Sequence, residues 1–306
     1  MIYTHTSNPS IDYYLTLDQQ HECTIYRAKD AQMVVGGKGI NVSIVLNEFK
    51  VDTVVTTFLG GKIGEWIHDA LMVYPHITVD AIPIDQTNRI NVKIRGSSEF
   101  DINASGPLVK TNALDAMIHQ FDGLNQEDIV VVSGSLSPGV SKQFVMDLAK
   151  LVHQRNALFI LDTSGWSYEE IISTRADLIK PNQSEFDALF PQYPPGTAIE
   201  EKANQLLHDG IHRILLSKGN EGAEYFDPTN HYLIHHPAID AIDTVGCGDS
   251  MIAGFLYGWL NHYSLESTLK IAAASGIACA ATIALPPRAL IEHYIPTIEI
   301  KKEKTQ

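Results

Sequence analysis

The sequence predicts an α/β protein in which helices cover both faces of a mostly parallel sheet. Short runs of β-branched and other apolar residues recur along the chain. Between these runs lie amphipathic segments whose apolar residues recur at three- and four-residue spacing, as they do on one face of a helix. This alternation of strand and helix is typical of parallel sheets, because each connection between parallel strands must cross a face of the sheet.

The alternation can be followed in order along the chain. Strands are expected at 54–58, 129–132, 158–161, 178–179 and 211–216. Helices are expected near 62–73, 111–121, 141–153, 182–189 and 198–209. The uncharged stretch 271–287 is interpreted as a buried helix, because it falls short of the about 20 strongly apolar residues that span a bilayer.

Two regions, 11–35 and 82–106, interrupt this alternation. In the second region Ile90, Val92 and Ile94 share one register and polar residues share the other, which is typical of an antiparallel sheet with one exposed face. We therefore expect the two insertions to form a small β lid on a single domain that spans residues 1–306. No linker, low-complexity run or internal repeat in the sequence divides that domain.

The composition is acidic and typical of a globular protein. The 306 residues include 22 Lys or Arg and 36 Asp or Glu, which gives a formal net charge of −14. This excess of carboxylates disfavours a nucleic acid or an anionic membrane as a partner, because clustered cations bind both. The three cysteines lack metal-ligand spacing, and the first residues lack the features of a secretory signal. We therefore expect a cytoplasmic protein with no membrane or nucleic-acid partner.

The strongest local motif is the stretch 243–250, which reads DTVGCGDS and leads into an apolar helical segment. Glycines at a helix start let backbone N–H groups converge on an anion, so the motif predicts an anion hole at Gly246, Cys247 and Gly248. A carboxylate beside such a hole is costly unless it takes a proton from the hydroxyl that attacks a phosphate, which is our hypothesis for Asp249. On spacing alone, a simple helix cap is an equally good interpretation of Asp249.

A second glycine-rich turn, GGKGIN at 36–41, also leads into a helical segment. It is not a Walker A loop, because the lysine lacks both the preceding glycine frame and a following Ser or Thr. A polyhydroxylated ligand would suit the turn, since Asn41 offers a donor and an acceptor and Lys38 offers a cation. Taken alone, the segment is better interpreted as a glycine turn with an exposed lysine.

Six motifs occur in order along the chain. They are NPSID at 8–12, GGKGIN at 36–41, SGS at 133–135, KPNQSE at 180–185, SKGNEG at 217–222 and GCGD at 246–249. Their order and spacing resemble the ribokinase-like (PfkB) carbohydrate kinase family over essentially the whole chain. The resemblance implies a ribokinase-like three-layer α/β/α fold with a β lid, ATP and Mg²⁺ as cosubstrates, and phosphoryl transfer to a sugar hydroxyl.

The stretch TNRINVK at 87–93 is similar to the phosphosugar branch of that family, and to 1-phosphofructokinases in particular. The planar fork of Arg89 matches a phosphate already on the sugar, although a surface arginine is the simpler interpretation of that residue alone. The resemblance implies phosphorylation of fructose 1-phosphate to fructose 1,6-bisphosphate. Tagatose 6-phosphate and fructose 6-phosphate are alternative substrates, because a furanose phosphate presents nearly the same shape when turned round. A non-catalytic sugar-phosphate-binding regulator is the alternative from another class.

The resemblance also implies a role for each residue of the motifs. For the sugar phosphate the implied residues are Asp12, Gly37, Lys38, Asn41, Arg89, Asn91, Ser133 and Ser135. For ATP they are Lys180, Asn182, Ser217, Gly219, Gly222, Thr244, Gly246 and Gly248, and Glu185 holds Mg²⁺ through water. Asp249 is implied as the general base, with Gly246, Cys247 and Gly248 around the transferring phosphoryl group. The presence of both Asp249 and Glu185 disfavours the non-catalytic alternative.

One departure from the family pattern is Cys247, which stands where the family usually has Ala. A thiol at a helix N-terminus is often reactive, so we expect thiol-sensitive activity. An inert small side chain is the alternative. The resemblance further implies a homodimer formed through the lid.

Overall fold

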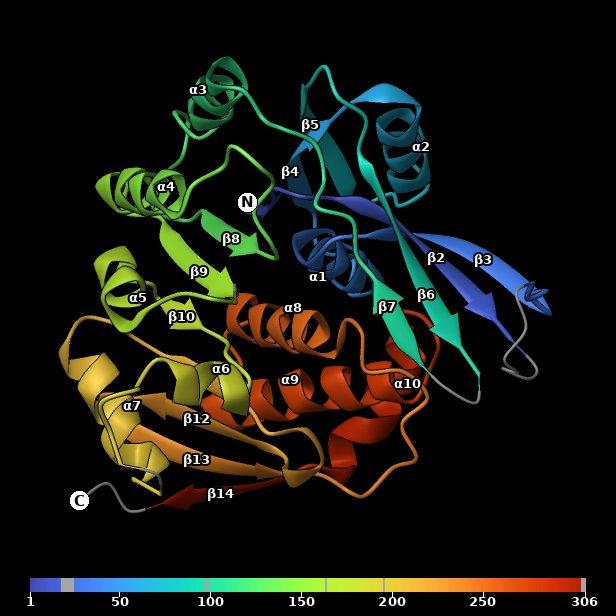
Figure 1. Cartoon of the computed structure of the whole chain (residues 1–306). Helices are drawn as coiled ribbons and strands as arrows, with labels where there is room; N and C mark the ends of the chain where they lie inside the picture. The colour runs from blue at the N-terminus through green and yellow to red at the C-terminus, as the bar shows by residue number, and fades with distance from the viewer. Residues whose placement is uncertain (18–24, 97–98, 163, 195, 304–306) are drawn as a thin grey trace.

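One large sheet with helices on both faces lies beside a second, smaller sheet (Figure 1). The computed structural model describes residues 1–17, 25–96, 99–162, 164–194 and 196–303. Within these residues the main sheet has ten strands in the order β14-β13-β12-β11-β10-β9-β8-β1-β4-β5. These strands are β1 (Ile2–Thr6), β4 (Thr53–Leu59), β5 (Ile77–Pro83), β8 (Ile129–Ser133), β9 (Leu158–Asp162), β10 (Leu178–Ile179), β11 (Ile214–Ser217), β12 (Ala223–Asp227), β13 (Asn230–His235) and β14 (Glu299–Glu303).

Neighbouring strands of the main sheet run parallel from β5 to β11, and the remaining pairs, from β11 to β14, are antiparallel. The parallel part is apolar on both faces. In β8, for example, Val130 and Val132 pack into one core and Ile129 and Val131 into the other. The prediction of a mostly parallel sheet buried between two layers is therefore confirmed.

Two helical layers enclose the main sheet. One core is formed with α3 (Thr111–His119), α4 (Lys142–Gln154), α5 (Tyr168–Thr174), α6 (Gln183–Ala188) and α7 (Ile199–His208). Across the sheet lie α1 (Lys38–Glu48), α2 (Gly61–Leu71), α8 (Cys247–Leu260), α9 (Leu265–Ala280) and α10 (Arg288–Tyr294). The stretch 271–287 is a buried helix only as far as Ala280, because a loop that leads to two prolines follows. No helix among the described residues combines the length and apolarity needed to span a membrane.

The second sheet consists of β2 (Ser10–Thr16), β3 (Asp30–Gly36), β6 (Arg89–Arg95) and β7 (Phe100–Ile102), in the order β3-β2-β6-β7. The two expected insertions supply these strands, although residues 18–24 of the first lie outside the described residues. The second insertion also begins inside the main sheet, because β5 continues to Pro83. That the second sheet acts as a lid stays a prediction.

The expectation of antiparallel pairing holds within each insertion, since β2 pairs antiparallel with β3 and β6 with β7. Between the two insertions it was wrong, because β2 and β6 pair in parallel. The polar register of β6 is also not its solvent face. Asn91 and Lys93 are buried while Ile90 is 41% exposed, since the polar face covers a cavity at the edge of the main sheet.

Candidate active site

A cavity of about 730 Å³ lies where the carboxyl ends of the central strands meet the N-terminus of α8 and the polar face of the second sheet. Open α/β sheets bind their ligands at this edge. Of the residues implied by the resemblance, all but Ser133 line the cavity. These are Asp12, Gly37, Lys38, Asn41, Arg89, Asn91, Ser135, Lys180, Asn182, Glu185, Ser217, Gly219, Gly222, Thr244, Gly246, Cys247, Gly248 and Asp249.

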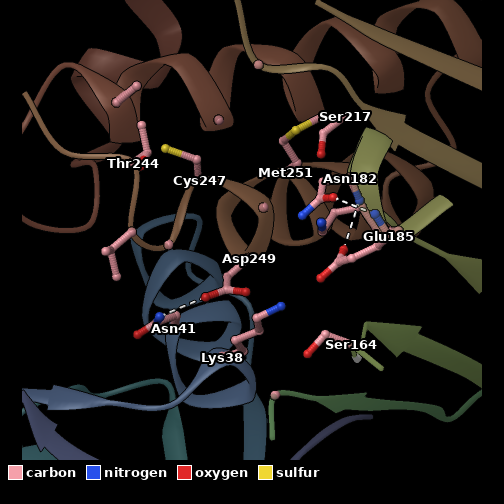
Figure 2. Close-up of a pocket in the computed structure, with 18 of the residues that line it drawn as sticks. Lys38, Asn41, Ser164, Asn182, Glu185, Ser217, Thr244, Cys247, Asp249 and Met251 are labelled. Carbon is pink, nitrogen blue, oxygen red and sulfur yellow. Dashed lines mark hydrogen bonds between the residues drawn. The ribbon is translucent and has the colours of Figure 1, made fainter. Parts of the chain in front are cut away.

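Asp249 lies in the first turn of α8 at the centre of the cavity wall (Figure 2). Helix α8 begins after Gly246, whose φ of 82° is a conformation that favours glycine. Asp249 is only 3% exposed, and its Oδ2 accepts a 2.7 Å hydrogen bond from Nδ2 of Asn41. Burial, together with the negative charge of Asp162, raises the pKa of Asp249 to about 7. A carboxyl with this pKa can accept a proton near neutral pH.

Asp162 forms ion pairs with two lysines that line the cavity. It ends β9, and its two carboxylate oxygens lie 3.4 Å from Nζ of Lys38 and 3.4 Å from Nζ of Lys180. Although burial favours the neutral carboxyl, Lys180 and Lys38 lower the pKa of Asp162 below its ordinary value, so it is ionised. Sequence reasoning missed Asp162. The available signal was its position directly after a buried apolar strand.

Ser133 is placed differently from the expectation that it contacts the substrate phosphate. Its side chain is buried, and its Oγ donates to Oδ2 of Asp162 at 3.1 Å. The end of β8 lies beside the end of β9 in the parallel sheet, so the hydroxyl is used in holding this carboxylate. Ser135, two residues later, does line the cavity.

The second sheet contributes a hydrogen-bonded polar face. Nδ2 of Asn91 donates to Oδ1 of Asp12 at 2.8 Å, which leaves Asp12 as an oriented acceptor at the cavity wall. The guanidinium of Arg89 donates to the carbonyl oxygens of Asn8 and Ala104, at 2.9 Å each. These acceptors are neutral, so the positive charge of Arg89 is not cancelled by a carboxylate bonded to it.

Lys93 is a cation of the cavity that sequence reasoning left without a role. It is 6% exposed and its Nζ donates to Asp101 at 2.6 Å and to Asn103 at 3.3 Å. The available signal was its register. Lys93 lies on the same face of β6 as Arg89 and Asn91, and all three line the cavity.

On the other side of α8, Asn182 and Glu185 begin α6 with reciprocal bonds (Figure 2). Oδ1 of Asn182 accepts from the backbone N–H of Glu185 at 2.8 Å, and Oε2 of Glu185 accepts from that of Asn182 at 2.9 Å. This capping box fixes both side chains at the cavity edge. The capping box alone explains the spacing of the two residues. Only Oε2 of Glu185 takes part in it, so the other carboxylate oxygen is not used there.

One part of the cavity wall is apolar. Small and branched side chains from α9 and from the loop before α8 form it. These residues are Ile239, Val245, Ala273, Ile277 and Ala280. Sequence reasoning interpreted the α9 residues only as core, because a buried small-residue helix has the same composition whether it faces a core or a flat apolar ligand.

The donor set fits a hydrated metal ion better than a fully protein-bound one. Among the described residues, no group of three or more His, Cys, Asp or Glu side chains could hold a metal ion. Mg²⁺ retains most of its waters and is bound through one or two carboxylates and substrate phosphates. Glu185, at the edge of the cavity, suits such an outer-sphere site.

The chain is similar to known carbohydrate kinases over most of its length. Residues 5–284 match the model of the pfkB family carbohydrate kinases, and the chain belongs to that family. It is 30% identical over 99% of its length to the whole of a 1-phosphofructokinase from Bacillus subtilis. It is 31% identical, over 90% of its length and 91% of the relative, to a tagatose-6-phosphate kinase from Staphylococcus epidermidis.

A crystal structure of phosphofructokinase-2 from Escherichia coli, in complex with substrates and products, covers 96% of this chain and 98% of its own, with a TM-score of 0.89 and 24% identity. The ribokinase-like fold is thereby confirmed. Taken together, the family and its kinase relatives show that the protein is an ATP-dependent phosphosugar kinase.

Proposed function

We propose that the enzyme phosphorylates fructose 1-phosphate to fructose 1,6-bisphosphate, with Asp249 as the general base. The observation that most supports the role of Asp249 is that a buried carboxyl with a pKa raised to about 7 lies in the first turn of α8. Asp249 takes the proton of the attacking hydroxyl, and backbone N–H groups of Gly246, Cys247 and Gly248 stabilise the charge on the transferring phosphoryl group. Asn41 holds the base in position through its 2.7 Å bond.

The cationic residues around the sugar end support a phosphorylated substrate. Arg89 and Lys38 both line the cavity, and Arg89 has no carboxylate among its hydrogen-bond acceptors. Asp12, oriented by Asn91, accepts hydrogen bonds from sugar hydroxyls. This set binds the existing phosphate and orients the free hydroxymethyl group toward Asp249.

The opposite end of the cavity supports the binding of ATP. Lys180, Asn182, Ser217, Gly219, Gly222 and Thr244 surround its phosphates, and the apolar part of the cavity wall suits an adenine base. Lys180 lies against α8 so closely that a Cβ on Gly248 would be 2.7 Å from its Nζ. This places a cation at the N–H groups that stabilise the phosphoryl charge. Mg²⁺, held through water by Glu185, supplies further charge neutralisation when bound.

The substrate is tested by measuring ADP release with three ketohexose phosphates side by side. We expect kcat/KM to be highest with fructose 1-phosphate. A higher value with tagatose 6-phosphate or fructose 6-phosphate would replace the proposed substrate by that sugar. No turnover with any of them would favour the non-catalytic sugar-phosphate-binding regulator. Asp249→Asn protein, purified in parallel, controls for contaminating kinases.

We also propose that two copies pair through the second sheet. Met33, Ile90, Phe100 and Ile102 are exposed large apolar side chains that the strand register places on one face of this sheet, opposite Asp12 and Asn91. Exposed apolar clusters mark contact surfaces. Sedimentation equilibrium should show a dimer that Phe100→Asp weakens. Met72→Asp is the matched control, since Met72 is 59% exposed elsewhere on the molecule, at the end of α2. A monomeric wild-type protein, or equal effects of the two substitutions, would contradict the proposal.

A further inference from the structure

A buried carboxylate lies beside the turn at 217–222, which joins β11 to β12. Glu224, in β12, is only 6% exposed. Its Oε1 accepts a 3.0 Å hydrogen bond from Nζ of Lys218, and its Oε2 accepts a 2.9 Å bond from Nε2 of His231 in β13. These three side chains, which we call the Glu224 cluster, are absent from the lining of the cavity.

The Glu224 cluster lies on a face of the sheet that faces a hydrophobic core. Glu224 and Phe226 share one face of β12, and Phe226 packs into the core formed with α6 and α7. The ring of His231 stacks on that of Phe226, with 4.2 Å between the ring centres. A carboxylate in such a place costs free energy unless cations or other donors bond to it. Both oxygens of Glu224 are bonded, so the carboxylate is held from two sides.

The turn at 217–222 depends on contacts with the rest of the protein for its position. It contains Gly219, with a φ of 56°, and Gly222, with a φ of 98°, and glycine restricts the backbone least. Within the turn, the backbone N–H of Lys218 donates to the carbonyl oxygen of Gly222 at 2.9 Å. Lys218 is also the first residue after β11. The bond from its Nζ to Glu224 therefore anchors the turn at the point where it leaves the sheet.

The same turn contacts the start of α6. The backbone N–H of Ser217 donates to the carbonyl oxygen of Pro181 at 3.1 Å, and Ser217 forms a parallel bridge with Asn182. Asn182 and the turn both line the cavity. An anchor on the turn therefore acts on the part of the cavity that we assign to the phosphates of ATP.

We propose that Glu224 is a positioning residue for ATP, which acts through Lys218 to hold the turn at 217–222 where its backbone approaches the nucleotide phosphates. The inference rests on the proposed function, in which this turn contacts ATP. Neither Glu224 nor Lys218 lines the cavity, so the contribution is indirect. Its consequence is weaker binding of ATP, with unchanged binding of the phosphosugar, when the bond is broken.

Glu224→Met tests the anchor, because it keeps the length of the side chain and removes both acceptors. We expect the Kd of ATP, measured by calorimetry with Mg²⁺ and without sugar, to rise about tenfold, the effect of losing a hydrogen bond between charged groups. The KM of the phosphosugar should be unchanged. Glu221→Met is the matched control, since Glu221 lies 3.8 Å from the same Nζ but is 80% exposed. Equal Kd values for the two variants would overturn the proposal.

A double-mutant cycle shows whether Glu224 acts through Lys218. Lys218→Met should weaken ATP binding as Glu224→Met does, and the double variant should bind no more weakly than the weaker single variant. Lys218→Arg, which retains a cation for Glu224, should bind ATP nearly as the wild type does. Additive losses, or weakening by Lys218→Met alone, would overturn the proposed coupling and show that Lys218 acts on the nucleotide by another route.

Two further measurements separate this role from general destabilisation and from failure of the proposed function. Without nucleotide, the amides of the turn at 217–222 should exchange hydrogen faster in Glu224→Met, while those of β1 keep their wild-type rates. Faster exchange throughout the sheet would overturn the positioning role. Lys180→Met removes a cation assigned to ATP itself. An unchanged Kd in Lys180→Met would refute the proposed nucleotide site, whereas weakening there with an unchanged Kd in Glu224→Met would refute only the role of Glu224.

Discussion

Asn41 and Asp249, 208 residues apart in the chain, are joined by a 2.7 Å hydrogen bond between the first turns of α1 and α8. The bond fixes one oxygen of a buried carboxyl whose pKa is raised to about 7. Both helices begin after a glycine, Gly37 or Gly246, so two glycine-rich turns bring the amide and the carboxyl together. This pairing supports the interpretation of Asp249 as a base rather than as a helix cap alone.

The rate should depend on the ionisation of Asp249. A base accepts a proton only in its carboxylate form, so kcat/KM for the phosphosugar should rise with pH, with a midpoint near 7 set by the pKa of Asp249. Activity should be lost as the pH falls below that midpoint. The measurement is a profile of kcat/KM between about pH 5 and 9 at saturating MgATP. A flat profile through neutral pH would contradict the assignment.

Asp162→Asn should move this midpoint to lower pH. The negative charge of Asp162 raises the pKa of Asp249, and removing it also leaves Lys38 and Lys180 without their shared partner. Both changes favour the carboxylate form of Asp249, so we expect a shift of about one pH unit. The midpoint is the informative quantity, because kcat itself should fall as well. Asp147→Asn, which removes an exposed carboxylate of α4, is the control. An upward shift of the midpoint in Asp162→Asn, or no shift, would contradict the electrostatic account.

Arg89→Gln should weaken binding of the phosphosugar. The substitution removes the cation that we assign to the existing phosphate, and a charge-assisted hydrogen bond of this kind corresponds to an increase in KM of about tenfold or more. The KM of ATP should stay near its wild-type value, because Arg89 lies on the second sheet, away from the proposed nucleotide end. Arg155→Gln, at the end of α4, is the control. An unchanged KM for the sugar would remove Arg89 from the site.

The motifs predicted the site better than they predicted its surroundings. Lys38, Asn41 and Asp249 belong to short glycine-containing motifs, whose function leaves a local signature. Asp162 has no such motif, because its role depends on two lysines that are far apart in the chain, Lys38 at the start of α1 and Lys180 directly after β10. Its contribution therefore emerges only from the three-dimensional arrangement.

The second sheet shows a similar limit. The alternation in β6 correctly predicted a strand with two different faces, but not which face is buried, because solvent and a polar cavity select the same residue types at Asn91 and Lys93. The direction of β2 relative to β6 depends on the number of elements between them, which local patterning does not encode. Ser133 was likewise predicted beside a ligand but bonds to Asp162.

Alkylation of Cys247 should abolish activity. Cys247 lines the cavity at the first position of α8, so a bulky group on its sulfur would obstruct the anion hole. Cys279 contacts Cys247, and this contact and burial raise the pKa of Cys279, which should slow its own labelling. Iodoacetamide should therefore inactivate the wild-type and Cys279→Ala proteins at similar rates but spare Cys247→Ala. Equal inactivation of Cys247→Ala would show that Cys247 is not the sensitive group.

His5 should make the fold sensitive to acid. It is fully buried in β1, and burial lowers its pKa to about 4, against 6.5 for the ordinary side chain. Below about pH 6.5 His5 is protonated in the unfolded chain but stays neutral in the folded protein. The free energy of unfolding therefore falls as the pH decreases toward 4. At about pH 5 the loss is about 2 kcal/mol.

Urea unfolding of the wild-type and His5→Gln proteins at about pH 7 and pH 5 measures this contribution. The wild-type protein should lose more free energy of unfolding between the two pH values than His5→Gln. His119→Gln, with a side chain that is 75% exposed, should behave like the wild type. Parallel pH dependence in the wild-type and His5→Gln proteins would contradict the assignment.

The role of Asp249 is tested most directly by the turnover of Asp249→Asn with fructose 1-phosphate and MgATP, measured by ADP release. Asn keeps the shape of the side chain but cannot accept the proton. We predict a fall in kcat of at least about 10²-fold, the contribution of general base catalysis, with the Kd of ATP largely unchanged. Turnover near the wild-type rate would show that Asp249 caps the helix and that another group takes the proton.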